Sequence, residues 1–124
     1  MLGISVASLE QIHHFALVWA SKFADMGSTY QQLVDPALAR DCEAIGFVMD
    51  SGKAFQAKYG DAIYDYKALR LVIDDVTDIA LLGSAIYSQW HYFDYRTNNA
   101  ETIVKHNNRT WFTLALTRLA ELTA

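Results

Sequence analysis

The chain has 124 residues, of which 52% are hydrophobic, and a formal net charge of −4 at pH 7. This length suits one domain that buries a core of its own, so we predict a single helical domain over residues 1–124. Residues 35–78 hold nine acidic and five basic side chains, and residues 79–124 hold three acidic and four basic ones. Because binding along a phosphate backbone needs clustered Lys and Arg, this balance disfavours nucleic acid as a partner.

Cysteine content and hydropathy indicate the compartment. The single cysteine, Cys42, cannot form an internal disulfide, which favours a reducing environment. The N-terminal segment has no basic region and reaches Glu10 before an apolar region forms, so it does not have the pattern of a signal peptide. The longest uncharged apolar-rich segment, residues 79–92, is too short to span a bilayer. We therefore expect a cytoplasmic protein with no membrane partner.

The first helix is predicted from a start signal, an apolar stripe and a stop signal. Ser8, with Gln11 three residues later, has the spacing of a capping box, and Gly27 is a residue type that ends helices. We therefore predict a helix over residues 9–26. Its apolar stripe consists of Leu9, Ile12, Phe15, Ala16, Trp19, Phe23 and Met26.

The middle of the chain is harder to assign. An Asp-Pro pair at 35–36 marks the start of a second helix, which ends near Asp50 or continues with a bend to Lys58. The spacing of apolar residues over 54–76 favours helix. Residues 69–73 could equally form a short buried strand, because they include a continuous apolar run.

Two helices are predicted in the last part of the chain. Apolar residues at three- and four-residue steps over 79–93 make a wide apolar face, which indicates the most buried helix. Residues 94–108 are polar, with 102–104 as a short strand or a tucked loop, and Asn107 or Asn108 caps the final helix. The predicted fold class is all-α: an antiparallel bundle of four to five helices, with room for one short β-hairpin.

Two patterns raise the question of a metal site. Asp74, Asp75 and Asp78 form a D-D-x-x-D sequence that can hold Mg²⁺, but the pattern is short and a second metal motif does not accompany it. Negative charge that complements the dipole of the following helix is the favoured interpretation. His13 and His14 project about 100° apart on a helix, so they cannot act as an i, i+4 ligand pair. We expect no metal site and no cofactor.

No residue has the sequence surroundings of a catalytic nucleophile. Cys42 lies on the apolar stripe of the second helix, and the flanking Asp41 and Glu43 raise the pKa of the thiol, which favours a buried structural cysteine. The chain also lacks the motifs of nucleophilic hydrolases, P-loop NTPases and dinucleotide-binding enzymes. We therefore predict no catalytic residue.

The aromatic segment 88–96 is the candidate binding region. On a helix, Gln89, Tyr92 and Arg96 line one face at three- and four-residue steps, and Arg109 from the next helix can join them. Tyr and Arg are enriched at binding hot spots because they combine a large contact area with directed hydrogen bonds. The alternative is that the aromatic side chains complete the core and the polar atoms anchor the following loop.

Residues 81–93 and 108–122 carry a resemblance to known proteins. Their sequences, Leu-Leu-Gly-Ser-Ala-Ile-Tyr-Ser-Gln-Trp-His-Tyr-Phe and Asn-Arg-Thr-Trp-Phe-Thr-Leu-Ala-Leu-Thr-Arg-Leu-Ala-Glu-Leu, resemble a group of uncharacterised small proteins from gut-type Gram-positive bacteria and their mobile elements. The resemblance covers the C-terminal third of the chain. It implies a bacterial cytoplasmic setting and an accessory role, and it implies no catalytic or binding residue.

These observations predict a non-enzymatic interaction or accessory protein, encoded on a mobile element, that binds a protein partner or a second copy of itself. The alternative is a small-ligand binder or enzyme that holds an anion in a cleft between the aromatic helix and the final helix. Such a cleft would use Gln89, Tyr92, Arg96 and Arg109. A DNA-binding regulator is disfavoured, because the final helix has too few basic residues for a recognition helix.

Overall fold

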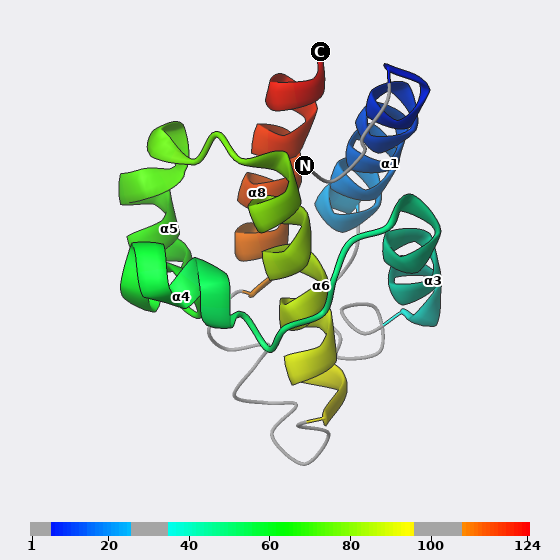
Figure 1. The fold of residues 1–124 in the computed structure, drawn as a ribbon. Coiled ribbons are helices and arrows are strands. Elements are labelled where there is room, and N and C mark those ends of the chain that lie inside the picture. The colour runs from blue at the N-terminus through cyan, green and yellow to red at the C-terminus, as the bar shows by residue number, and fades with distance from the viewer. Residues whose placement is uncertain (1–5, 26–34, 96–107) are drawn as a thin grey trace.

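The structure is a computed structural model, and it describes residues 6–25, 35–95 and 108–124. These residues form six α-helices and two short 3₁₀-helices, without a strand among them, so the predicted all-α fold is confirmed (Figure 1). In chain order the elements are α1 (Val6–Asp25), α3 (Pro36–Ile45), α4 (Lys53–Tyr59), η1 (Gly60–Ile63), α5 (Tyr66–Val72), η2 (Ile73–Asp75), α6 (Ile79–Tyr95) and α8 (Asn108–Thr123).

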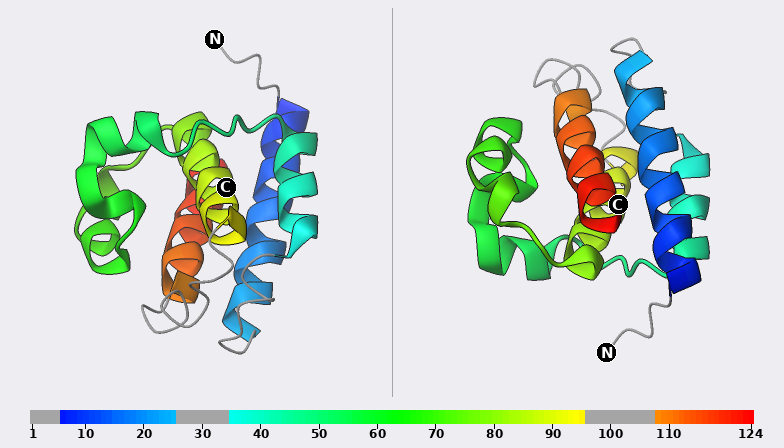
Figure 2. Two further views of the ribbon diagram at one scale, coloured as in Figure 1. Left: turned by 90° about the horizontal axis from the view of Figure 1, so that it is seen from below. Right: turned by 90° about the horizontal axis from the view of Figure 1, so that it is seen from above.

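Helices α1, α6 and α8 form the centre of the bundle (Figures 1 and 2). Helix α8 runs antiparallel to both α1 and α6, and its contact with α1 is the most extensive in the fold (Figure 1). The short α3 packs against α1 and α6 on one side of this centre, and α4 and α5 lie on the other (Figure 2). The architecture is therefore a central helix group with a small helical layer on each side.

The core is filled by the apolar stripes predicted from the sequence. Phe23 of α1 stacks on Phe112 of α8 with 4.6 Å between the ring centroids. Burial of large apolar side chains of this kind stabilises the fold by about 1.5–3 kcal/mol each. The completely buried core residues of the three central helices are Ile12, Ala16, Trp19, Phe23, Leu82, Ala85, Ile86, Trp111, Phe112, Ala115, Leu116 and Leu119.

Two helix boundaries correct the sequence predictions. Helix α1 includes Val6 and Ala7, so Ser8 lies inside the helix and not at its cap. Helix α3 ends at Ile45, short of the predicted end near Asp50 and without a bend into α4. The cause is Gly46, which adopts a left-handed φ of 96° and donates its backbone N–H to carbonyl groups of α3.

The ambiguous segment 54–76 is helical, as the spacing favoured. The strand alternative for 69–73 is wrong, because Leu69 lies inside α5 with its side chain completely buried and Ile73 begins η2. Helix α6 matches the predicted 79–93 helix and continues to Tyr95, and α8 begins at Asn108. The predictions for residues 102–104 and Asn107 lie outside the described residues.

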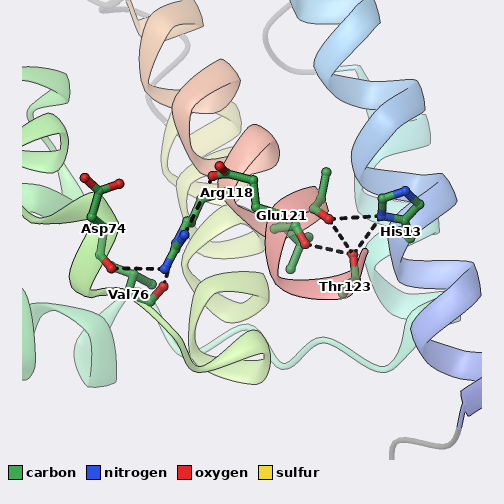
Figure 3. A network of polar contacts seen from close by, with 8 residues as sticks. His13, Asp74, Val76, Arg118, Glu121 and Thr123 are labelled. Atoms are coloured by element: carbon green, nitrogen blue, oxygen red, sulfur yellow. Dashed lines mark hydrogen bonds and ion pairs between the residues drawn. The ribbon is translucent and has the colours of Figure 1, made fainter.

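Polar contacts fasten the C-terminal half of α8 on both of its sides (Figure 3). Nδ1 of His13 in α1 lies 3.0 Å from the carbonyl oxygen of Ala120. Since a carbonyl oxygen can only accept, His13 is the donor in this hydrogen bond. On the opposite side, Arg118 donates to the carbonyl oxygens of Val76 at 2.9 Å and Asp74 at 3.0 Å. These contacts set the position of α8 relative to both α1 and the η2 segment.

Two indole groups anchor further elements to the central helices. Trp90 of α6 donates from Nε1 to the carbonyl oxygen of Asp35 at 3.0 Å, at the start of α3. Trp111 of α8 donates to the carbonyl oxygen of Ala62 in η1 at 2.7 Å. Because a buried indole N–H without an acceptor is costly, each bond fixes where the neighbouring element lies.

The connection between α3 and α4 crosses α6 at a glycine. Phe47 of this connection is buried, meets Phe15 of α1 edge-on, and lies directly against Gly83 of α6. A Cβ atom on Gly83 would overlap the Phe47 ring. The absence of a side chain at Gly83 therefore allows the connection to lie close to α6.

We predict that Gly83→Ala lowers the free energy of unfolding by about 1–3 kcal/mol, because overpacking of the Phe47 ring outweighs the better helix propensity of alanine. Urea unfolding followed by circular dichroism measures the change. The double variant Gly83→Ala/Phe47→Leu should recover part of the loss, since leucine frees the space that the Cβ atom needs. Equal stability of Gly83→Ala and the wild type would contradict this packing.

Candidate functional site

An open groove of about 380 Å³ lies between α1 and α3. It exists because the short α3 covers only part of the α1 surface that faces away from α8. The spacing of its lining residues on each helix is three or four, so one face of each helix forms a wall. The lining residues are Gln11, His14, Phe15, Val18 and Trp19 from α1, with Asp41, Ala44 and Ile45 from α3.

The groove has an apolar floor and a more polar rim. Phe15 and Trp19 are buried at its base, and Val18 and Ile45 are half-buried above them. The exposed rim residues are Gln11, His14, Asp41 and Ala44. Pockets that bind other molecules usually combine such apolar surface with a few polar groups that fix orientation.

A buried indole joins the two helices that line the groove. Trp19 donates from Nε1 to Oδ2 of Asp41 at 2.8 Å, and the Lys22 ammonium nitrogen lies 4.3 Å from the centroid of the Trp19 ring. These contacts tie α1 to α3 and fix the Asp41 carboxylate at the groove. The groove is therefore already formed in the free chain.

The binding residues predicted from the sequence do not line this groove. Gln89 of α6 is only 2% exposed, and its Nε2 is buried without a hydrogen-bond partner among the described residues. The side chains of Tyr92 and Arg109, and the whole of Arg96, lie outside the described residues. The predicted convergence of Gln89 with these three side chains therefore stays a prediction.

The aspartates of the D-D-x-x-D sequence are used by the fold in different ways. Asp78 accepts from the backbone N–H of Leu81 at 3.1 Å and so caps the start of α6, as the helix-dipole interpretation predicts. Asp74 and Asp75 lie in η2, where their carbonyl groups accept hydrogen bonds from other elements. In the part of the chain that the structure describes, no group of three or more His, Cys, Asp or Glu could hold a metal ion.

The Cys42 thiol is fully buried, which confirms its prediction as a structural residue. Burial raises its pKa well above the ordinary value, and the neighbouring Asp41 and Glu43 charges raise the pKa further. Tyr87 of α6 donates to Glu43 of α3, and this hydrogen bond, with burial, raises the pKa of the phenol to about 12. Both side chains therefore join α3 to its surroundings in their neutral forms.

A polar cluster around Asp50 is a feature that the sequence analysis missed. The carboxylate accepts hydrogen bonds from the backbone N–H groups of Gly52 at 2.8 Å and Ala54 at 3.1 Å, at the start of α4. It also accepts from the hydroxyls of Ser84 at 3.1 Å and Ser88 at 3.2 Å on α6. The signals in the sequence were an Asp-Ser-Gly turn and two serines four residues apart on one helix face.

Geometry gives the Asp50 cluster a structural role. Burial alone would raise the pKa of its carboxyl group, but the four hydrogen bonds to the charged form outweigh burial and lower the pKa below the usual 3.8. Both serine hydroxyls donate to the carboxylate, whose lowered pKa makes it a weak base for activating a nucleophile. The cluster therefore fixes the α3–α4 connection onto α6.

Comparisons of the chain with protein-family models, with curated proteins and with solved structures gave no match. The resemblance carried by residues 81–93 and 108–122 stays a prediction, and no residue role comes from another protein. Among the residues that the structure describes, no helix is both long enough and apolar enough to cross a membrane.

We predict that Asp50→Asn lowers stability at pH 7 by about 0.5–2 kcal/mol, because an amide keeps one acceptor oxygen but turns an NH₂ group towards another donor. The lowered pKa makes the carboxylate stabilising above its usual pKa, and this contribution is lost as pH falls through the lowered value. The unfolding free energies of wild type and variant should therefore stay apart from pH 7 down to about the usual pKa of 3.8 and converge as the pH falls further, through the lowered pKa.

Urea unfolding at several pH values measures this convergence, with Asp61→Asn as the control. Asp61 is an exposed aspartate of η1, and its replacement removes the same charge without touching the cluster. A difference between Asp50→Asn and wild type that stays constant down to the lowest pH would show that the carboxylate charge is not what stabilises the contact.

Proposed function

We propose that this chain is a non-enzymatic interaction protein that docks a partner protein through the groove between α1 and α3. The observation that carries the proposal is a preformed groove with an apolar floor and a fixed carboxylate at its rim. The resemblance in the C-terminal third extends the proposal to an accessory protein of a bacterial mobile element. The unpaired Cys42 favours the cytoplasm as its location.

The physical support comes from what the groove offers to a binding surface. A partner that covers Val18 and Ile45 removes apolar area from water without requiring the walls to refold. The Trp19–Asp41 hydrogen bond keeps the two walls in register, so little conformational entropy is lost on binding. Small exposed side chains at the rim, such as Ala44, let another backbone approach closely.

Ala44→Lys tests the groove as the docking surface. Ala44 is exposed on a helix, so lysine is compatible with the fold but places a positive charge and extra volume at the groove mouth. Peptides selected from a displayed library against the wild-type chain should bind Ala44→Lys about tenfold more weakly or worse. Thr117→Lys, at an exposed position of α8, is the matched control and should bind like the wild type.

Light scattering on the same variants shows whether the groove binds a second copy of the chain or a different protein. A wild-type dimer that becomes a monomer in Ala44→Lys would identify a second copy of the chain as the partner. Selected peptides that bind wild type, Ala44→Lys and Thr117→Lys equally would place docking elsewhere and remove the groove from the proposal.

A second candidate function is favoured by Gln89. Among the described residues the buried Nε2 group of Gln89 has no hydrogen-bond partner, and an anionic ligand held by this donor would offset the cost of leaving such a group unpaired. This is the anion-binding alternative predicted from the sequence, with Tyr92, Arg96 and Arg109 as the remaining groups. It requires that the ligand reach Gln89, which is 2% exposed in the free chain.

We predict that Gln89→Leu raises the free energy of unfolding by about 1 kcal/mol, because it replaces an unsatisfied polar group by an apolar one of similar size. Thermal and urea unfolding with and without inorganic phosphate measure both the stability and the binding. If Gln89 binds anions, phosphate stabilises the wild type and not the variant. Destabilisation by Gln89→Leu would show that the amide has a partner, and identical phosphate responses would exclude the anion site.

A further inference from the structure

Charge along the groove indicates the chemistry of its partner. Asp41 is the one Asp, Glu, Lys or Arg among the eight side chains that line it. Asp41 is exposed, and one of its oxygens accepts the hydrogen bond from Trp19. In the described part of the chain this carboxylate forms no ion pair within 4.0 Å. It is therefore able to pair with a cation from outside.

Lys22 contacts the same indole as Asp41, and no ion pair between the two side chains lies within 4.0 Å. Its ammonium group lies over the ring of Trp19, where the cation is attracted by the aromatic face. Glu10 and Arg40 are exposed on α1 and α3 but do not line the groove. The charge at the groove itself is thus negative, in a chain whose formal net charge is −4.

The form of the groove favours a helix over an extended peptide. An extended peptide leaves its backbone N–H and C=O groups to be satisfied by the receptor, usually by a free sheet edge. Both walls here are helices, whose own backbone groups are already paired, and the rim offers only a few polar side chains. A helix satisfies its backbone bonds internally and needs from the groove only a place for an apolar stripe.

We infer that the groove binds an amphipathic helix of a partner protein that carries Lys or Arg beside its apolar stripe, positioned against Asp41. The inference rests on the proposed docking function and adds the chemistry of the partner. The apolar stripe contacts Phe15, Val18 and Ile45, and the basic side chain pairs with the free oxygen of Asp41.

Three synthetic helical peptides test the inference on the full chain. They share one leucine stripe and carry Lys, Gln or Glu at the positions that flank it. Isotope-labelled protein is titrated at about 0.15 M salt, where charges more than about 8 Å apart are largely screened. The Lys peptide should shift α1 and α3 resonances and bind about two- to fivefold more tightly than the Gln peptide, with the Glu peptide weakest.

Asp41→Asn and Asp61→Asn form the matched pair of variants. Asparagine at position 41 still offers an oxygen to Trp19, so the wall is kept while the charge is removed. Asp61→Asn removes the same charge from η1, which lies across the bundle from the groove (Figure 1). The preference for the Lys peptide should disappear in Asp41→Asn and persist in Asp61→Asn.

The possible results distinguish a wrong partner chemistry from a wrong docking site. Peptides that bind the groove equally well whatever their flanking residues overturn the basic partner and leave groove docking intact. A Lys preference lost equally in both variants also overturns it, since net charge then explains the effect. Peptides that leave the α1 and α3 resonances unchanged count against the docking function itself.

Discussion

The enclosure of α8 is the constraint on which the rest of this fold depends. Its apolar residues Trp111, Phe112, Leu116 and Leu119 are completely buried, and the helix has α1, α5 and α6 as neighbours. A helix with apolar residues on more than one side is stable only when other elements surround it. The arrangement of the remaining helices follows from providing that cover. The Arg118 contacts then keep the helix from sliding between its neighbours.

This constraint also explains why a groove forms on the far side of α1. The core face of α1 is occupied by its long contact with α8, so α3 packs onto a flank of α1. Because α3 is short and has alanine at position 44, it leaves Val18 and the edge of Phe15 at the floor of an open depression. Phe15 and Trp19 therefore belong to both the groove and the core, and only the exposed rim residues can vary in sequence without loss of the central packing.

The central helices could be predicted from the sequence because their apolar residues repeat at helical spacing and end at recognisable stop signals. The segment between 46 and 53 could not, since its course depends on contacts far apart in the chain. Phe47 lies against Gly83, and Asp50 bonds Ser84, over sequence separations that no local pattern encodes. The end of α3 was not predicted either. Apolar residues continue at helical spacing beyond Ile45, but the helix stops there because Gly46 adopts a left-handed backbone conformation.

The site was harder to predict than the fold. Phe15 and Trp19 were correctly predicted to face inward, but nothing local shows that they also lie at the base of a groove between α1 and α3. The Trp19–Asp41 bond joins two helices whose relative position depends on the whole bundle. Gln89 was placed on a binding face by its spacing with Tyr92, whereas its stripe on α6 coincides with that of Ile86, which is buried.

The three indole N–H groups have acceptors at three different positions, two on α3 or its N-cap and one in η1, and this makes the chain optically informative. Trp19 reports on the α1–α3 wall, Trp90 on the start of α3, and Trp111 on the attachment of η1 to the core. Variants that retain a single tryptophan would thus separate, by emission wavelength and quenching, an event at the outer wall from loosening of the interior. Intrinsic fluorescence can in this way distinguish a bound molecule from partial unfolding without any attached dye.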